Sequence, residues 1–303
     1  MKYVFLLMII GTSLQSFAQE RMFFGRVIDN NKKGIPFAVV EAKGRNEGVY
    51  CNEDGVFSFR GNADSIKVLV ISCMGYERKE IITEILPLDS IIAELKPRIA
   101  SLKEVAIKGK KGKTKEGVLG KNGKKLRYDG DCYRYYGSET AVLLKPNEEE
   151  EGTLKDIYVY ITNDGDYTTK FRIHVYAWDT GTKVPTEEIT DSNLVVMATS
   201  GNMWVKASLA DKNIHVDGGL FVSVEWISGF GNNENKLQSS LNPEVTSYNG
   251  QVLGITSDYG RESIVYNRKP FHREWEYYDP PDAQRKYGRF LNPMIYCTYT
   301  YVR

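Results

Sequence analysis

The sequence is poor in histidine and proline, and it has no excess of charge of one sign. Its 303 residues include three His and ten Pro against 20 Tyr and 12 Phe, and 40 basic residues balance 39 acidic ones. The formal net charge of +1 gives no electrostatic signal for nucleic-acid binding. With so few histidines, the chain is short of candidates for a general base. The Tyr and Phe content instead favours β-strands.

Motifs of the common hydrolytic and metal-dependent chemistries are also missing. The chain has no C-x-x-C, so a thioredoxin-type site and a zinc knuckle lack support. It has no G-x-S-x-G either, and its histidines lie far apart in the sequence. His272 and Glu274 match the H-x-E half of the zinc-deaminase signature, but the P-C-x-x-C half is absent. We therefore expect no catalytic residue, no metal and no cofactor.

The only strongly apolar stretch stands at the N-terminus, in MKYVFLLMIIGTSLQSFAQE. A single Lys precedes an apolar run over residues 3–10, and the letters SFA, ending at Ala18, supply a cleavage site. The run is too short to span a bilayer, and no later segment is suited to a transmembrane helix. We predict a signal peptide over residues 1–18. The mature protein is then exported to the periplasm, the outer membrane or the cell surface of a Gram-negative bacterium.

Residues 23–95 read as short strands separated by turns, among them FFGRVID, IPFAVVEAKG, IKVLVISCMGY and SIIAELK. None of these runs shows a sustained 3.6-residue period, so they predict a small antiparallel sandwich. Between two of the runs, NEDG predicts a tight turn that includes Asp54, with Gly55 free to adopt positive φ. We expect a hairpin turn here, because a calcium loop needs regularly spaced oxygen ligands that end in a bidentate acid.

The order of these runs resembles the carboxypeptidase-regulatory-like domain. The resemblance covers residues 22–107, through FGRVIDNNKKGIPFAVVEAKG, GVYCNEDGVFSF, VLVISCMGY and LKEVAI. Its landmarks are Gly25, Asp54, Gly55, Phe57, Gly75 and Tyr76. The chain departs from the family at Cys51 and Asn52, where Thr-Asp is usual. The resemblance implies a non-catalytic, transthyretin-like Greek-key sandwich in an envelope protein of the Bacteroidetes, where this module often precedes outer-membrane transporters.

Residues 108–125 break the pattern. This segment, KGKKGKTKEGVLGKNGKK, has eight Lys and five Gly against one Glu, so it has little to bury. We predict a flexible linker, with a polybasic arm for anionic surfaces as the alternative. The linker separates the predicted domains at 20–107 and 126–303.

Strand patterns return after residue 126. In LKDIYVYIT, the apolar Ile157, Val159 and Ile161 alternate with tyrosines, and KFRIHVYAWD alternates in the same way. With GGLFVSVEWISG and GRFLNPMIYCTYTYV, they predict a larger, jelly-roll-like β-sandwich. The order of the runs also resembles secreted Bacteroidetes proteins in which a second sandwich follows the regulatory-like module. We therefore expect an all-β protein.

Aromatic residues supply the candidate binding site. The segment FHREWEYYDPPD, residues 271–282, joins aromatic side chains to acids and two prolines. Aromatic faces stack on sugar C–H surfaces, and neighbouring acids bind hydroxyl groups. The candidate ligand-binding residues are Trp178, Trp204, Trp275, Tyr277 and Tyr278, with core packing as the alternative. Glu274 and Glu276 have the separation of a glycosidase pair, but such acids are also common on solvated strands.

Cysteines offer a further structural prediction, because an exported protein meets oxidising conditions. Cys132 and Cys297 flank the second predicted domain, whose first and last strands are expected to be neighbours. A disulfide between them is one possibility, and buried free thiols are the other.

These observations favour an exported envelope protein with a binding or structural role and no catalytic activity. It would recognise a glycan or a partner protein of the outer membrane or secretion machinery. The alternative is a glycan-active hydrolase or esterase with its site on the second sandwich. A cluster of His174, His215 or His272 with acids around a cavity would contradict the non-catalytic interpretation.

Overall fold

The chain is built from β-strands. In the computed structural model, the residues described are 20–85, 90–98, 112–120, 137–146, 151–179, 181–227, 237–238, 246–247, 250–259, 263–279 and 289–303. Within these ranges the only helical element is one short 3-10 turn, η1 (Thr83–Ile85). The all-β prediction is therefore confirmed. The predicted signal peptide lies outside the described residues.

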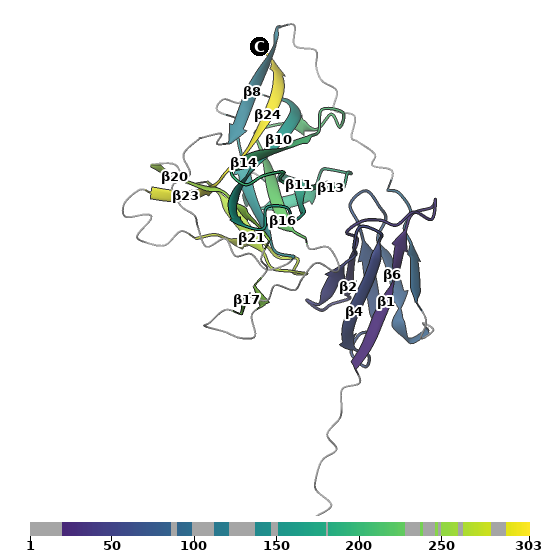
Figure 1. The fold of residues 1–303 in the computed structure, drawn as a ribbon. Helices are drawn as coiled ribbons and strands as arrows, with labels where there is room; N and C mark the ends of the chain where they lie inside the picture. The colour runs from purple at the N-terminus through teal and green to yellow at the C-terminus, as the bar shows by residue number, and fades with distance from the viewer. Residues whose placement is uncertain are drawn as a thin grey trace, which may run out of the picture.

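Residues 20–85 and 90–98 form two sheets, which together we call the N-terminal body (Figure 1, purple to blue). In the first sheet, β1 (Glu20–Ile28) lies between β4 (Val56–Asn62), antiparallel to it, and β7 (Ile91–Glu94), parallel to it. The second sheet is antiparallel and has the order β3-β2-β5-β6. Its strands are β2 (Val39–Ala42), β3 (Gly48–Tyr50), β5 (Val68–Ser72) and β6 (Lys79–Ile82).

The core of the N-terminal body follows the two-residue period of its strands. Along β1, Phe23 and Val27 are buried, whereas Phe24 and Arg26 point outward. Buried side chains from both sheets meet in one cluster, with Phe57 from β4 and Leu69 from β5 among them. The alternation seen in the sequence therefore places the apolar side chains between the sheets.

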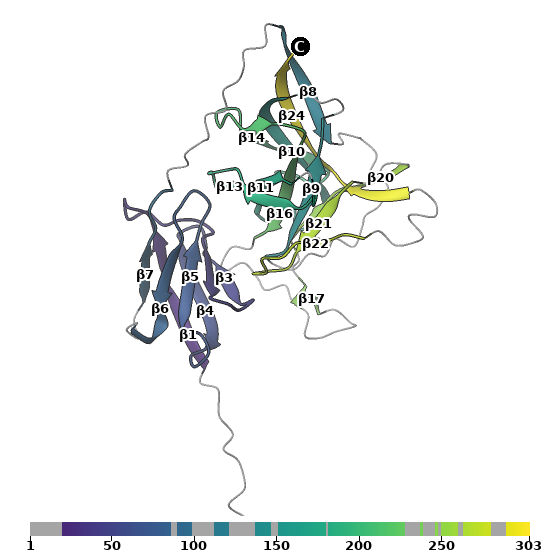
Figure 2. The same cartoon turned by 180° about the vertical axis from the view of Figure 1, so that it is seen from behind.

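The remaining strands form the C-terminal body, residues 112–303, which both views show as a separate group (Figures 1 and 2, teal to yellow). Its larger sheets have the orders β14-β10-β24-β8, with β15 and β19 also on β10, and β12-β11-β16-β9-β21-β22, with β13 on β11. Two small pairs, β17-β18 and β20-β23, complete it. The strands are β8 (Thr114–Gly120), β9 (Glu139–Leu144), β10 (Gly152–Gly165), β11 (Phe171–Trp178), β12 (Pro185–Glu188), β13 (Leu194–Val196), β14 (Met203–Ser208), β15 (His215–Val216), β16 (Leu220–Trp226), β17 (Leu237–Gln238), β18 (Thr246–Ser247), β19 (Gln251–Leu253), β20 (Ile255–Tyr259), β21 (Val265–Arg268), β22 (Glu276–Tyr277), β23 (Arg289–Pro293) and β24 (Ile295–Val302).

One apolar core joins the two large sheets of the C-terminal body. Ile157, Val159 and Ile161 of β10 are fully buried in it, as their alternation predicted. From the other sheet, Val175 of β11 and Trp226 of β16 enter the same cluster. The jelly-roll and Greek-key strand orders stay predictions.

Strand β8 corrects the predicted linker. Residues 114–120 form a strand within the segment 108–125, and they pair antiparallel with β24 from Tyr296 to Val302. Leu119 explains this, because its side chain is fully buried in the core. Burial of this one leucine and pairing with the edge of β24 therefore favour a strand, although the segment is rich in Lys. Residues 108–111 and 121–125 lie outside the described residues.

The turn around Asp54 and Gly55 has a local hydrogen-bond pattern supplied by Asn52. The Asn52 Oδ1 atom accepts hydrogen bonds from the backbone N–H groups of Asp54, at 3.0 Å, and of Val56, at 2.8 Å. Gly55 adopts a φ of +76°. The turn does not close a hairpin, however, because β3 pairs with β2 and β4 pairs with β1. It carries the chain from one sheet of the N-terminal body to the other.

Replacing Gly55 by alanine is expected to destabilise the N-terminal body more than replacing Gly44. Both glycines have a φ of +76°, so both substitutions carry the strain of a left-handed residue, about 1 kcal/mol. A Cβ at Gly55 would lie 2.3 Å from the Val27 carbonyl oxygen, whereas at Gly44 it would meet nothing within 4 Å. We expect Gly55→Ala to cost about 3 kcal/mol in urea unfolding. Equal losses for the two variants would contradict this.

The N- and C-terminal bodies share an interface of apolar and polar contacts. Phe37, Tyr50 and Ile227 are buried together in it. The Arg172 Nη2 atom donates to the Phe37 carbonyl oxygen at 2.6 Å, and the Asn193 Nδ2 atom donates to that of Pro36 at 3.1 Å. These contacts hold the edge of the N-terminal body against strands β11 and β16.

Candidate functional site

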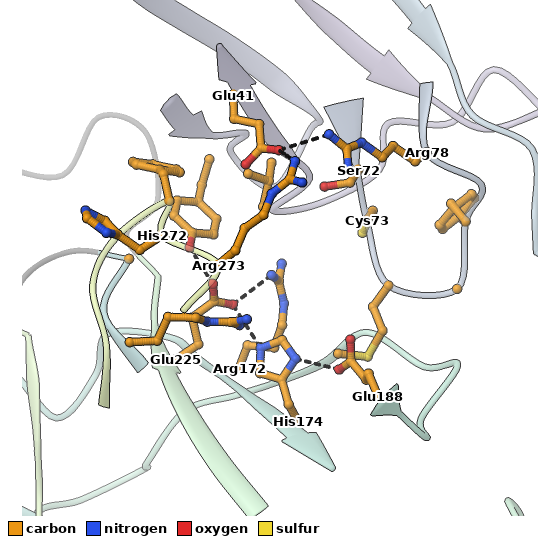
Figure 3. Close-up of a pocket in the computed structure, with 18 of the residues that line it drawn as sticks. Glu41, Ser72, Cys73, Arg78, Arg172, His174, Glu188, Glu225, His272 and Arg273 are labelled. Carbon is orange, nitrogen blue, oxygen red and sulfur yellow. Dashed lines mark hydrogen bonds and ion pairs between the residues drawn. The ribbon is translucent and has the colours of Figure 1, made fainter. Parts of the chain in front are cut away.

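A cavity of about 430 Å³ lies between the two bodies (Figure 3). Its N-terminal wall includes Glu41, Ser72 and residues 73–78. Its C-terminal wall includes Arg172 and His174, together with residues 268, 269 and 271–273. Neither body forms this site alone.

The strands of the C-terminal body bring the charged residues of the cavity wall together. On β11, Phe171, Ile173 and Val175 enter the core, so Arg172 and His174 point to the opposite face of the sheet. That face is also buried, because the N-terminal body contacts it through Phe37 and Tyr50, and Trp275 packs on Tyr176. In the register of the sheet, Arg172 lies opposite Glu225 of β16, and Glu225 lies opposite Glu139 of β9.

Arg172 and Glu225 form the centre of a buried ion network. The Arg172 Nη1 atom lies 2.9 Å from the Glu225 Oε2 atom, and both side chains are less than a tenth exposed. The other carboxylate oxygen of Glu225 accepts a hydrogen bond from the Tyr50 hydroxyl group of the N-terminal body. This carboxylate therefore links the two bodies directly.

His174 lies between two carboxylates. Its Nδ1 atom is 2.6 Å from the Glu188 Oε1 atom, and its Nε2 atom is 3.1 Å from the Glu225 Oε2 atom. Figure 3 shows the ring between the two acids, with Arg172 on the same carboxylate of Glu225. Both ring nitrogens are thus occupied by acceptors.

Glu139 extends the network away from the cavity. It is 1% exposed and accepts hydrogen bonds from the hydroxyl groups of Ser223 and of Tyr176, the latter at 2.9 Å. Its second oxygen forms an ion pair with Arg268. Three carboxylates, two guanidinium groups and one imidazole therefore form one network, with Glu188 and Arg268 at its partly exposed edge.

The charges in this region control one another's protonation. Burial alone lowers the pKa of His174, but the charges of Glu139 and Glu188 and the hydrogen bonds to Glu188 and Glu225 raise it to about 10. Burial alone raises the pKa of Glu225, whereas the Arg172 charge and the hydrogen bond from His174 hold it well below its usual range. At neutral pH, His174 is then an imidazolium and Glu225 is a carboxylate, so the network is electrically balanced.

This cluster brings His174 among acids around a cavity, the arrangement that counts against the non-catalytic interpretation of the sequence. Its chemistry is nevertheless poorly suited to general-base catalysis, because His174 already carries both ring protons at neutral pH. His215 lies apart on β15, whereas His272 lines the cavity. Glu274 and Glu276 are exposed, and Glu276 is paired with Lys269 at 2.8 Å.

Three members of the network have the composition of a metal site. Glu139, His174 and Glu225 each offer one ligand atom, and these atoms lie within 4.8 Å of one another. The bond from His174 to Glu188 also resembles the carboxylate support that metal-bound histidines usually have. The guanidinium groups of Arg172 and Arg268, however, already neutralise the two ligand carboxylates. These side chains are therefore better described as acids paired with arginines than as the ligands of a metal ion.

The N-terminal body can be assigned by comparison with known families. Residues 23–107 match the family model of the CarboxypepD_reg-like domain. The resemblance inferred from the sequence is thus confirmed for this part of the chain. The CarboxypepD_reg-like domain supplies the wall of the cavity that carries Glu41 and residues 72–78. No curated protein matches the chain.

Three of the five candidate aromatic residues contact one small apolar cluster, which contains Tyr176 and Tyr266, without lining the cavity. Trp275 packs edge-on against Tyr176, with ring centroids 5.5 Å apart, and the Arg268 guanidinium lies 4.5 Å from the Trp275 ring centroid. Trp178 packs against the same small apolar cluster. Tyr277 is 45% exposed and meets Tyr266 edge-on.

The other two candidate aromatic residues are separated from this group. Trp204 lies on β14 of the other large sheet, edge-on to Tyr160 and Tyr296 at centroid distances of 5.2 and 4.8 Å. Tyr278 packs against the main core of the C-terminal body. The five residues therefore do not form one continuous aromatic surface.

The described cysteines are buried free thiols. Cys51 and Cys73 lie in the core of the CarboxypepD_reg-like domain, and Cys297 lies in that of the C-terminal body. Burial raises the pKa of Cys51 to about 12 and that of Cys297 further. Cys297 is thus a free thiol, the alternative to the predicted disulfide, and Cys132 lies outside the described residues.

No helix among the described residues combines the length and apolar character that crossing a bilayer requires.

Proposed function

We propose that this is an exported, non-catalytic binding protein of the Gram-negative cell envelope, and that its ligand site is the cavity between the two bodies. The observation that carries the proposal is the cavity itself, whose volume of about 430 Å³ falls within the range of small-molecule sites. Its wall is polar and held by buried ion pairs, so the donors are already in place before a ligand arrives.

A saccharide from the envelope suits this wall. Hydroxyl groups need both donors and acceptors at short range, and arginine, glutamate, histidine and serine side chains line the cavity. Export to the cell envelope, which the N-terminal apolar run predicts, would bring such a ligand within reach. The aromatic residues contribute less than the sequence suggested, because none of the five candidates lines the cavity.

Blocking the cavity is expected to abolish ligand binding. Ser72 lies on β5 and lines the cavity, so Ser72→Trp should fill it. Ser58→Trp is the matched control, since Ser58 lies on β4 of the other sheet and not on the cavity wall. We expect envelope mono- and oligosaccharides to raise the melting temperature of the wild type and of Ser58→Trp, but not of Ser72→Trp. A response that all three proteins share would place the site elsewhere.

The glycan-active hydrolase remains the second candidate, because His174 lies among three carboxylates beside a cavity. Chromatography of the same saccharides after prolonged incubation separates the two functions. Binding without new products supports the proposal. Products that the wild type forms and His174→Gln does not would establish the hydrolase instead.

A further inference from the structure

The cavity has more basic than acidic side chains at its solvent-exposed mouth. The buried part is balanced, because Arg172, His174 and Arg268 face Glu139, Glu188 and Glu225. At the exposed mouth, Arg78, Arg98 and Arg273 outnumber Glu41 and Glu77. Arg78 of the N-terminal body and Arg273 of the C-terminal body share the carboxylate of Glu41.

Glu41 projects from β2. The Nη2 atoms of Arg78 and Arg273 approach the same Oε1 atom, at 3.5 and 3.8 Å. Charge-assisted hydrogen bonds are normally about 2.7–2.9 Å long, so neither contact is optimal. Arg78 also interacts with Glu80 through its charge, but within the described part of the chain neither guanidinium group has another side-chain hydrogen bond or ion pair. Figure 3 shows both interactions across the cavity from His174 and Glu188.

We infer that the cavity binds a ligand with an oxyanion group, a carboxylate or a phosphate, which Arg78 and Arg273 hold after it displaces Glu41. The inference rests on the proposed function and specifies the ligand class of that site. Two guanidinium groups present several N–H donors in fixed planes, which match the oxygens of a carboxylate or phosphate. Arg98, exposed at the same mouth, adds a third positive charge.

Glu41 acts in this arrangement as an internal competitor. Its carboxylate occupies the position that the ligand oxyanion would take, and its removal frees both arginines. The side chain of Glu41 is 21% exposed, and those of Arg78 and Arg273 are 43% and 72% exposed. Substitutions at these three positions therefore leave the folded core intact, and their effects on binding should have opposite signs.

The test compares glucuronate, glucose 6-phosphate and glucose by calorimetric titration at low ionic strength. We expect one or both charged sugars to bind the wild type and neutral glucose to bind at least 10-fold more weakly. Arg78→Gln and Arg273→Gln should each weaken binding of the charged sugar by about 10-fold. Glu41→Gln should strengthen it by about 3- to 10-fold. The two charged probes distinguish a carboxylate from a phosphate ligand.

The matched controls are Arg45→Gln and Glu47→Gln, which remove an exposed ion pair of 2.8 Å that does not line the cavity. They should leave the affinity unchanged. The inference is overturned if no charged sugar binds, if glucose binds equally well, or if the Glu41 and arginine variants shift the affinity in the same direction. Glucose binding that Ser72→Trp abolishes and the arginine variants do not affect would overturn this inference alone and leave the proposed function standing.

Discussion

Replacing Glu225 by glutamine is expected to lower the free energy of unfolding by roughly 3–5 kcal/mol, the usual cost of removing one partner from a buried ion pair. The variant leaves the Arg172 guanidinium and the His174 imidazolium in place, with one carboxylate fewer to neutralise them. Both cations are less than a tenth exposed, so water replaces the missing partner poorly. Urea unfolding followed by tryptophan fluorescence measures the loss.

Two further variants show whether this loss comes from the buried charge. Glu116→Gln breaks an exposed pair with Lys155 and should cost less than 1 kcal/mol. Tyr50→Phe removes only a neutral hydroxyl donor from Glu225, so it should cost about 1–2 kcal/mol. A cost below 1 kcal/mol for Glu225→Gln would mean that the network is solvated and does not join the two bodies.

The position of Glu225 also affects how truncation experiments should be read. Deleting residues 20–107 would remove the Tyr50 hydroxyl group from Glu225 and the Phe37 carbonyl group from Arg172. It would also expose Ile227 to water. The C-terminal body would then lose stability for reasons unrelated to localisation. Substitutions on the exposed cavity mouth are therefore a cleaner probe of function than removal of the CarboxypepD_reg-like domain.

The strands of this protein could be predicted from the sequence because they follow a local rule. Alternation of apolar and polar residues predicts which side chains of a strand share a face, as for Ile157, Val159 and Ile161. The same rule failed for residues 114–120, where Lys and Gly obscure a strand whose main burial comes from Leu119. It also could not show that the turn at Asn52–Gly55 connects two sheets, because strand pairing is a long-range property.

The candidate site could not be predicted, because its residues come from distant parts of the chain. Arg172 and Glu225 are 53 positions apart, and Glu139 and Arg268 are 129 positions apart. Their meeting depends on the register of β9, β11, β16 and β21, which no single strand pattern encodes. One signal was nevertheless present: β11 and β16 carry charges on the face opposite an unbroken apolar face. A solvated second face would explain such charges equally well. Only the contact with the N-terminal body shows that this face is buried.

Raising the pH from 6.5 to 10 is expected to destabilise the folded protein through His174. An unfolded histidine loses its proton near pH 6.5, whereas His174 in the fold retains it up to a pH of about 10. Because the folded pKa is the higher one, the stabilisation by His174 is complete below pH 6.5 and is lost as the pH rises to about 10. The total loss is on the order of 5 kcal/mol. Urea unfolding at half-unit pH intervals measures it.

The difference between wild type and His174→Gln isolates this effect from other titrations. The buried thiols Cys51, Cys73 and Cys297 also have raised pKa values, so both proteins lose stability above about pH 8.5. Only the wild type should lose stability between pH 6.5 and 8.5 as well. Parallel curves over that range would mean that His174 is neutral in the fold. Its Nε2 atom would then be free to accept a proton, and the hydrolase would become the better explanation of the cavity.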